Sequence, residues 1–213
     1  LQIMAKTTKK QEVSYAEAMT EVEQILARCE QWGVYCIVDE AYGDFIPREE
    51  SAVTLGPKYK NIIIVRTFSK GFGLAGLRAG YIITTQDLIR YISKVSNPFM
   101  MSELSREMAA AALSDRTYGD SHSGDFIAMK TALREACGDN LTMACTDDRV
   151  PICLLQHRDE RIDLQEELMK HGVLCCSGTE FEPMERNSVR LRVPRAEEMG
   201  KLLTAIEAVG KGE

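Results

Sequence analysis

The chain has 213 residues, of which 45% are hydrophobic and 27% are charged, a composition that is ordinary for a globular protein of one large or two small domains. A formal net charge of −6 argues against a nucleic-acid-binding surface, which needs clustered Lys and Arg. No apolar stretch reaches the roughly 18 residues that indicate a membrane span, and no signal-peptide pattern opens the sequence.

Cysteines and histidines indicate neither disulfides nor a metal site. The seven cysteines form no CxxC pair, and the adjacent Cys175 and Cys176 are poorly placed to bridge each other. His122, His157 and His171 share no spacing that is typical of metal ligands. We therefore expect reduced thiols, a cytoplasmic protein and no bound metal.

The first half of the chain alternates between helix and strand patterns. A short strand is predicted over residues 1–5, and a helix is predicted between an N-cap at Ser14 and a terminating Gly33. Apolar runs follow at residues 34–38, 62–65 and 80–83. Such runs are typical of strands buried on both faces, and crossovers between them predict a mainly parallel α/β sheet.

The second half predicts a smaller α+β domain, with shorter strands among its helices. We place the domain boundary after Pro98, with residues 1–100 in the first domain and 101–213 in the second. The predicted helices cover residues 87–96, 101–113, 126–137, 164–171 and 196–209, a polar turn covers 117–124, and strands lie near 151–155, 173–176 and 189–193.

Asp39 ends the first apolar run, and ligands bind at this end of strands in open α/β sheets. A buried carboxylate needs a cation or several hydrogen bonds to compensate its burial. A protonated ring nitrogen would provide such a partner. The alternative is that Asp39 caps the following turn through its own backbone.

A lysine in a glycine-rich segment follows the second run, in the sequence Thr67-Phe68-Ser69-Lys70-Gly71-Phe72-Gly73. A lysine that acts as an amine nucleophile needs partial burial, whereas most lysines lie on solvated surfaces. Thr67 and Ser69 offer hydroxyl donors, and Arg78 offers a guanidinium suited to a phosphate. Tight packing between a strand and a helix would also explain the glycines.

The direction of the predicted strands relates Asp39 to Lys70. Asp39 and Lys70 each follow a run that predicts a parallel strand, so both should lie at the same edge of the sheet. A flat heteroaromatic ring would fit between them, with Tyr42 placed to bind the ring hydroxyl. A purely structural buried tyrosine is the alternative for Tyr42.

These motifs resemble fold-type-I pyridoxal-phosphate (PLP) enzymes of aminotransferase class I/II. The resemblance is carried by Asp39-Glu40-Ala41-Tyr42, by Thr67-Phe68-Ser69-Lys70 and by Gly76-Leu77-Arg78, and it is closest to histidinol-phosphate aminotransferases and threonine-phosphate decarboxylase. It implies the aspartate aminotransferase-like major domain, in part, followed by the smaller domain. It also implies that Lys70 holds PLP as a Schiff base, with Asp39, Tyr42, Thr67, Ser69 and Arg78 as cofactor-binding residues.

The resemblance continues to the end of the chain, where Ser188-Val189-Arg190-Leu191-Arg192-Val193 is similar to a family strand that carries a substrate-binding arginine. Arg190 and Arg192 face the same side of a strand, so periodicity does not choose between them. Alignment by resemblance favours Arg190. A solvated pair on an edge strand is the alternative.

Family members carry a longer N-terminal part, with a phosphate-binding nest, a ring-stacking aromatic and an Asn in an Asn-Pro-rich segment. Residues 5–11 contain neither Asn nor Pro, and Met100 and Met101 stand where this subgroup has polar residues. We therefore expect a chain that is truncated at the N-terminus relative to the family.

The resemblance implies an aminotransferase of amino-acid metabolism that acts on an amino acid or an amino-acid-derived phosphate. Its partners would be small molecules, namely an amino acid and a keto acid, and a second copy of the chain in a homodimer. A decarboxylase of the threonine-phosphate type is the enzymatic alternative. The non-enzymatic alternative is a truncated, non-catalytic module with the PLP fold.

Overall fold

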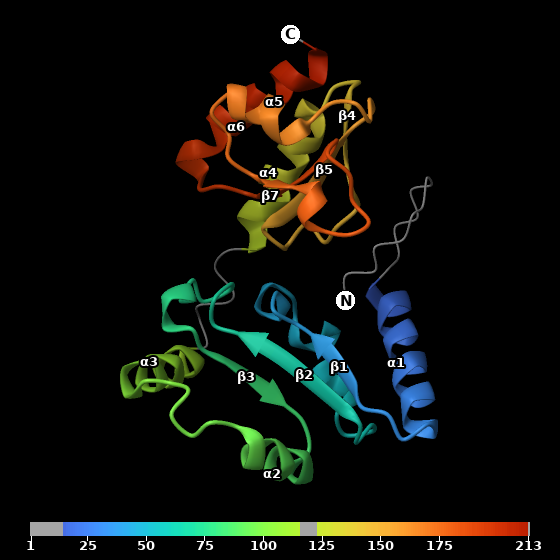
Figure 1. The fold of residues 1–213 in the computed structure, drawn as a ribbon, viewed down its shortest axis with the longest axis vertical. Coiled ribbons are helices and arrows are strands. Elements are labelled where there is room, and N and C mark those ends of the chain that lie inside the picture. The colour runs from blue at the N-terminus through green and yellow to red at the C-terminus, as the bar shows by residue number, and fades with distance from the viewer. Residues whose placement is uncertain (1–14, 116–122, 213) are drawn as a thin grey trace. The chain divides into compact units, whose positions relative to one another are not determined.

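The computed structural model describes residues 15–115 and 123–212, which form two compact units, Leu1–Ser121 and His122–Glu213 (Figure 1). The strand predicted at residues 1–5 and the N-cap at Ser14 lie outside the described residues. The division falls after residue 121 and not near residue 100, because the helix Glu103–Ser114 packs Ala109 against Phe68 and Ala79 of the first unit.

The first unit is a three-stranded sheet with the order β1-β2-β3 (Figure 1). Helix α1 lies beside β1, whereas α3 lies on the side of β3. The elements are α1 Tyr15–Gln31, β1 Cys36–Asp39, β2 Ile62–Thr67, β3 Gly80–Ile83, α2 Gln86–Val95 and α3 Glu103–Ser114. Gly33 ends α1 as predicted, with a φ of 63° and with the Val34 amide bonded to the Cys29 carbonyl.

The third strand runs antiparallel to the second, so within the predicted mainly parallel sheet β1 and β2 pair as expected and β3 does not. β1 and β2 are parallel, with Cys36 opposite Ile62, and β2 and β3 are antiparallel, with Thr67 opposite Gly80. A parallel return needs a crossover, usually a helix. The connection from β2 to β3 contains only the short 3₁₀ helix η4, Ala75–Leu77, and therefore closes as a wide hairpin.

β1 is also shorter and less buried than its apolar run predicted. Val34 and Tyr35 precede the strand and are exposed, and the Ile37 side chain is 66% exposed within it. Burial on both faces is therefore absent from β1 in this chain. Val38, by contrast, points into a core that α1 covers through Val22 and Leu26. Figure 1 shows α1 alongside this strand.

The second unit is an antiparallel four-stranded sheet with the order β4-β5-β7-β6, packed against three helices. The strand β4 was not predicted. The elements are α4 Ser123–Ala136, β4 Leu141–Met143, β5 Ile152–His157, α5 Leu164–Lys170, β6 Cys176–Ser177, β7 Ser188–Arg192 and α6 Ala196–Lys211. One apolar cluster joins all three helices to the sheet, through Leu133, Leu168 and Ile206 among others. This arrangement matches the predicted α+β character.

Candidate active site

Asp39 and the Lys70 segment emerge at the same edge of the first sheet. β1 ends at Asp39, which lies opposite Val65 in the parallel ladder, and the Glu40 amide donates to the Val65 carbonyl over 2.9 Å. β2 ends at Thr67, three residues before Lys70. The shared edge therefore follows from the parallel pairing of the two strands.

Tyr42 and Lys70 lie together at this edge. The Lys70 Nζ is 5.7 Å from the centroid of the Tyr42 ring, in a cation–π contact. Tyr42 is half-buried and packs at 6.1 Å, centroid to centroid, against Phe45. Lys70 itself is exposed, in contrast to the partial burial that an amine nucleophile needs.

The Asp39 carboxylate is exposed and bonds to its own turn. Its Oδ1 accepts a hydrogen bond from the Ala41 amide over 2.9 Å. The local capping interaction that was the alternative for Asp39 is therefore present. A contact with a ring nitrogen stays a prediction.

The two predicted hydroxyl donors lie side by side. Thr67 Oγ1 donates to Ser69 Oγ over 3.0 Å and accepts from the Ser69 amide over 3.1 Å. Thr67 Oγ1 also lies 3.3 Å from the Ala79 carbonyl, at the start of the returning strand. The pair is thus fixed between the end of β2 and the segment before β3.

Arg78 is exposed and lies in the left-handed region, with a φ of 51°. Its Nη1 donates to the Ala75 carbonyl over 3.0 Å, so the guanidinium bonds to its own loop. Its role toward a phosphate stays a prediction.

Phe68 anchors the glycine-rich segment that carries Lys70. It is 2% exposed and packs 5.3 Å from Phe72 and 5.4 Å from Tyr81, centroid to centroid. The Leu74 amide donates to the Phe68 carbonyl over 2.9 Å, and Gly73 takes a φ of 65° to close this turn. The alternation of aromatic and glycine residues therefore buries one side of the turn and leaves Lys70 on the other.

Three charged residues beneath this edge were missed by the sequence reasoning. Arg66 of β2 forms ion pairs with Glu40 at 2.8 Å and with Asp44 at 3.3 Å, and all three side chains are largely buried. Burial raises the pKa of the Asp44 carboxyl, although Arg66 opposes this shift. The sequence offered one indication of this group, namely that Arg66 directly follows the apolar run at residues 62–65.

Arg190 belongs to the second unit and is half-buried on β7. Its Cζ lies 4.7 Å from the centroid of Phe181, and its Nη2 lies 3.8 Å from the sulfur of Cys176. Arg192 on the same strand is exposed. Arg190 is thus the more firmly held of the two, and its carboxylate-binding role stays a prediction.

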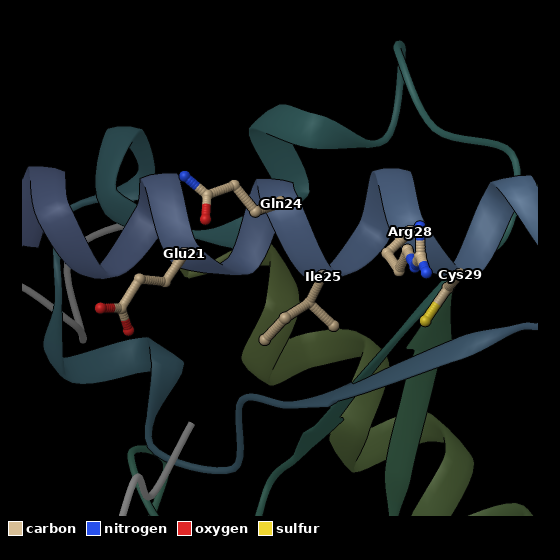
Figure 2. Close-up of a pocket in the computed structure, with 5 residues that line it drawn as sticks. All are labelled: Glu21, Gln24, Ile25, Arg28 and Cys29. Carbon is tan, nitrogen blue, oxygen red and sulfur yellow. The ribbon is translucent and has the colours of Figure 1, made fainter.

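A surface depression lies along α1, and none of the predicted site residues lines it (Figure 2). It is lined by Glu21, Gln24, Ile25, Arg28 and Cys29. Within residues 15–115 and 123–212, no cluster of His, Cys, Asp or Glu is arranged to hold a metal ion. No helix in these same ranges is long and apolar enough to cross a membrane.

Comparisons with known proteins decide the family. The family model for aminotransferase class I and II matches residues 18–206. The chain belongs to this family. The recognition made from Asp39-Glu40-Ala41-Tyr42 and the Lys70 segment is thereby confirmed at the level of the family.

Curated relatives of this class I and II aminotransferase chain include two histidinol-phosphate aminotransferases. The one from Methanocaldococcus jannaschii is 29% identical over 174 residues, which are 81% of this chain and 47% of the relative. The one from Thermotoga sp. is 31% identical over 192 residues, which are 88% of this chain and 52% of the relative. The chain therefore spans about half the length of these relatives.

Solved structures show the same fold. The histidinol-phosphate aminotransferase from Clostridium acetobutylicum matches with a TM-score of 0.78 at 18% identity, over 95% of this chain and 70% of that one. The L-threonine-O-3-phosphate decarboxylase from Porphyromonas gingivalis matches with a TM-score of 0.71 at 21% identity, over 90% and 59% respectively. The predicted aspartate aminotransferase-like fold, present in part, is confirmed.

Proposed function

We propose that this chain is part of a PLP-dependent aminotransferase that acts on an amino acid or an amino-acid-derived phosphate, with Lys70 as the residue that binds PLP covalently. The observation that carries the proposal is the contact of Lys70 with Tyr42, 5.7 Å from Nζ to ring centroid, at the sheet edge that also bears Asp39. Family membership supports it, as does the similarity to a Sinorhizobium meliloti histidinol-phosphate aminotransferase solved in complex with pyridoxal-5'-phosphate.

The donor groups at this edge fit the parts of PLP. Lys70 provides an amine for the aldehyde, Asp39 a carboxylate for the ring nitrogen and Tyr42 a phenol for the ring hydroxyl. The paired hydroxyls of Thr67 and Ser69 lie at the end of β2 and suit a phosphate. Arg78 adds a cation if its side chain leaves the Ala75 carbonyl.

When bound, PLP supplies an electron sink for the negative charge that develops at the substrate Cα. In our proposal, an incoming amino acid would first displace Lys70 from PLP; the freed amine would then take the proton from the substrate Cα, as general base, and deliver it to the C4′ carbon of the cofactor, as general acid. Asp39 holds a proton on the ring nitrogen, and Tyr42 donates to the ring oxygen. Arg190 binds the substrate carboxylate through its two parallel donors.

The proposed partners are an amino acid, a keto acid and a second copy of the chain. A homodimer and a cytoplasmic location stay predictions, the first from the family resemblance and the second from the thiols. All seven cysteines are free thiols in the structure. Sedimentation of the purified chain at several concentrations tests self-association.

Decarboxylation is the second candidate, because the chain also has the fold of the threonine-phosphate decarboxylase from Porphyromonas gingivalis. The two reactions differ in which bond at the substrate Cα is broken. A non-catalytic module with the PLP fold is the non-enzymatic reading, and the exposure of Lys70 is the observation that favours it.

Absorption spectroscopy of the purified chain during titration with PLP tests the cofactor assignment. We expect a visible band of protein-bound cofactor that is lost in Lys70→Ala and kept in Lys60→Ala, a control at another exposed lysine. Asp39→Ala should weaken or shift the band, with affinity falling about tenfold or more. A wild-type protein that develops no band contradicts the proposal and favours the non-catalytic module.

Product analysis then separates the two enzymatic readings. With PLP bound and an amino-acid substrate, an aminotransferase yields a keto acid and keeps the amino group on the cofactor. Release of carbon dioxide without keto acid would favour the decarboxylase. Neither product from a protein with bound PLP would contradict both enzymatic readings for this chain.

A further inference from the structure

A cluster of buried charges lies beneath the Lys70 turn, and none of its members is among the residues assigned to cofactor or substrate. The side chains of Arg66, Glu40 and Asp44 are only 13%, 9% and 12% exposed. The Arg66 Nη2 lies 2.8 Å and its Nε 3.1 Å from the same oxygen of Glu40, and its Nη1 lies 3.3 Å from Asp44. We call these three residues the Arg66 cluster.

The Arg66 cluster reaches the segments that carry Asp39, Tyr42 and Lys70. Glu40 directly follows Asp39, Asp44 lies two residues after Tyr42 in the 3₁₀ helix η1 (Gly43–Phe45), and Arg66 precedes Lys70 by four residues. The segments of Asp39, Tyr42 and Lys70 are therefore linked through one guanidinium.

Glu40 also fixes a fourth segment. It accepts hydrogen bonds from the Ser51 hydroxyl over 2.8 Å and from the Ala52 amide over 2.7 Å, at the start of the 3₁₀ helix η3 (Ala52–Leu55). Ser51 in turn accepts from Arg66 over 3.0 Å. The cluster is thus held from outside the site and does not depend on the cofactor residues for its own position.

Two glycines bring the site segments into direct contact with the cluster. A Cβ built on Gly71, the residue after Lys70, would lie 2.5 Å from the Cβ of Asp44 and 2.9 Å from its Oδ2. A Cβ on Gly43 would lie 3.0 Å from the Arg66 Cζ. The backbone next to Lys70 and the backbone next to Tyr42 therefore rest on charged side chains with no space between them.

Stability alone is a weak reason for such a cluster. Removing charges from water costs about as much free energy as their attraction returns, so a buried ion pair often adds little to stability while it fixes geometry. Among the described residues, the Oδ2 of Asp44 has no hydrogen-bond partner and faces Gly71. That imperfect pairing lowers the stabilisation further and leaves positional restraint as the main effect of the cluster.

We propose that Arg66 is a positioning residue, which with Glu40 and Asp44 sets the position of Lys70 relative to Asp39 and Tyr42. The proposal rests on the proposed function, because it assigns the geometry that PLP binding at Lys70 requires. Arg66 touches neither cofactor nor substrate in this assignment. A small displacement of Lys70 reduces cofactor capture even though every cofactor residue is retained.

Conservative substitutions in the full chain test this proposal. Arg66→Lys keeps the charge but loses the planar set of donors, and Asp44→Asn keeps the shape but loses the charge. The matched controls are Arg48→Lys and Asp87→Asn, which change exposed residues of the same unit. Urea unfolding of each variant establishes that it folds.

We expect the two cluster variants to bind PLP about ten- to hundredfold more weakly than wild type and to shift the wavelength of the bound-cofactor band. The control variants should match wild type in PLP affinity and in the wavelength of the band. Cluster variants that unfold earlier in urea but keep the wild-type affinity and band position would overturn the proposal, since the cluster would then serve stability alone.

Amide hydrogen exchange without cofactor separates this proposal from the proposed function. We expect Asp44→Asn to raise exchange at residues 40–45 and 68–73 while exchange in the second unit stays unchanged. If the wild type binds no PLP, the proposed function fails, and the exchange result alone decides whether the cluster restrains the Lys70 turn. Unchanged exchange in these two segments overturns the positioning role in either case.

Discussion

Single cysteines differ widely in their surroundings, and this difference predicts their reactivity. Burial raises the pKa of Cys153 to about 11 and, together with the neighbouring Cys176 thiol, that of Cys175 to about 11. Cys145 is exposed. At pH 8 a thiol with a pKa near 11 is ionised to only about one part in a thousand, and the thiolate is the reactive form.

We therefore expect iodoacetamide at pH 8 to label Cys145 at least about tenfold faster than Cys153 or Cys175. Peptide mapping by mass spectrometry after timed quenching measures the three rates. The same reaction in concentrated urea is the control, because unfolding should remove the difference. Equal rates in the native protein would contradict the burial of these thiols.

Lys130 is a charged residue that the second unit buries completely, with an exposed side-chain fraction of 0%. Burial lowers its pKa, and the Asp148 carboxylate, whose oxygen lies 3.6 Å from Nζ, opposes this shift. Its Nζ donates to the Thr146 hydroxyl and to the carbonyls of Asp147, Val150 and Ile152, over 2.7–3.4 Å. The ammonium group therefore ties α4 to the segment that leads into β5.

Lys130→Met should lower the free energy of unfolding by about 2 kcal/mol or more, because it leaves several buried acceptors without a donor. Urea denaturation monitored by circular dichroism measures the loss. Lys201→Met, at an exposed position of α6, is the control and should change stability by less than about 0.5 kcal/mol. A similar small change for both variants would show that Lys130 has no structural role.

Residues whose role depends on strand ends could be predicted from the sequence, whereas residues that pair across the sheet could not. Asp39 and Lys70 were placed at one edge because each follows an apolar run, and parallel strands end together. Arg66 pairs with Glu40 and Asp44 across 26 and 22 residues of sequence, and no local pattern links these positions. The buried cluster therefore emerged only from the structure.

Among the elements, long periodic helices were predicted well and strand direction was not. Helices α1, α2 and α6 begin and end within a few residues of their predicted limits. The direction of β3 depends on the path of the connection before it, which an apolar run does not encode. β4 has three residues, too few to show an alternating pattern.

Helix α6 offers a matched pair of glycine substitutions with opposite expected effects. A Cβ on Gly200 would meet no atom within 4 Å, whereas a Cβ on Gly210 would lie 2.3 Å from the Cys137 carbonyl oxygen, where α6 crosses the end of α4. Alanine is favoured over glycine in a helix by roughly 0.5–1 kcal/mol when nothing clashes.

We expect Gly200→Ala to raise the free energy of unfolding by about 0.5–1 kcal/mol and Gly210→Ala to lower it by about 1–3 kcal/mol through overpacking. Thermal unfolding of the two variants beside wild type provides the measurement. If both substitutions stabilise the protein, the close approach of α6 to the backbone near Cys137 is contradicted.

At the scale of the whole molecule, the two units differ in how completely they bury their apolar side chains. The second unit has a core that joins three helices and four strands. The first unit exposes several large apolar side chains on and directly after α1, on β1 and α2 and in the segment before α3, among them Trp32, Ile37, Val95 and Phe99. Exposed apolar area of this kind binds hydrophobic dyes and favours association.

Separate expression of residues 1–121 and 122–213 checks this difference. We expect 122–213 to unfold cooperatively and to bind little hydrophobic dye, and 1–121 to bind the dye strongly. Strong dye binding by 122–213 with no cooperative transition would contradict the independent core of the second unit.

We propose that Lys70 is the one lysine of this chain that forms a covalent bond with PLP. Incubation of the purified protein with PLP, followed by borohydride reduction and peptide mapping, measures this directly. We expect the reduced cofactor adduct on the peptide that contains Lys70, with other lysines labelled only in trace amounts. An adduct spread over exposed lysines such as Lys60 and Lys94 without preference for Lys70, or no adduct at all, would contradict the account.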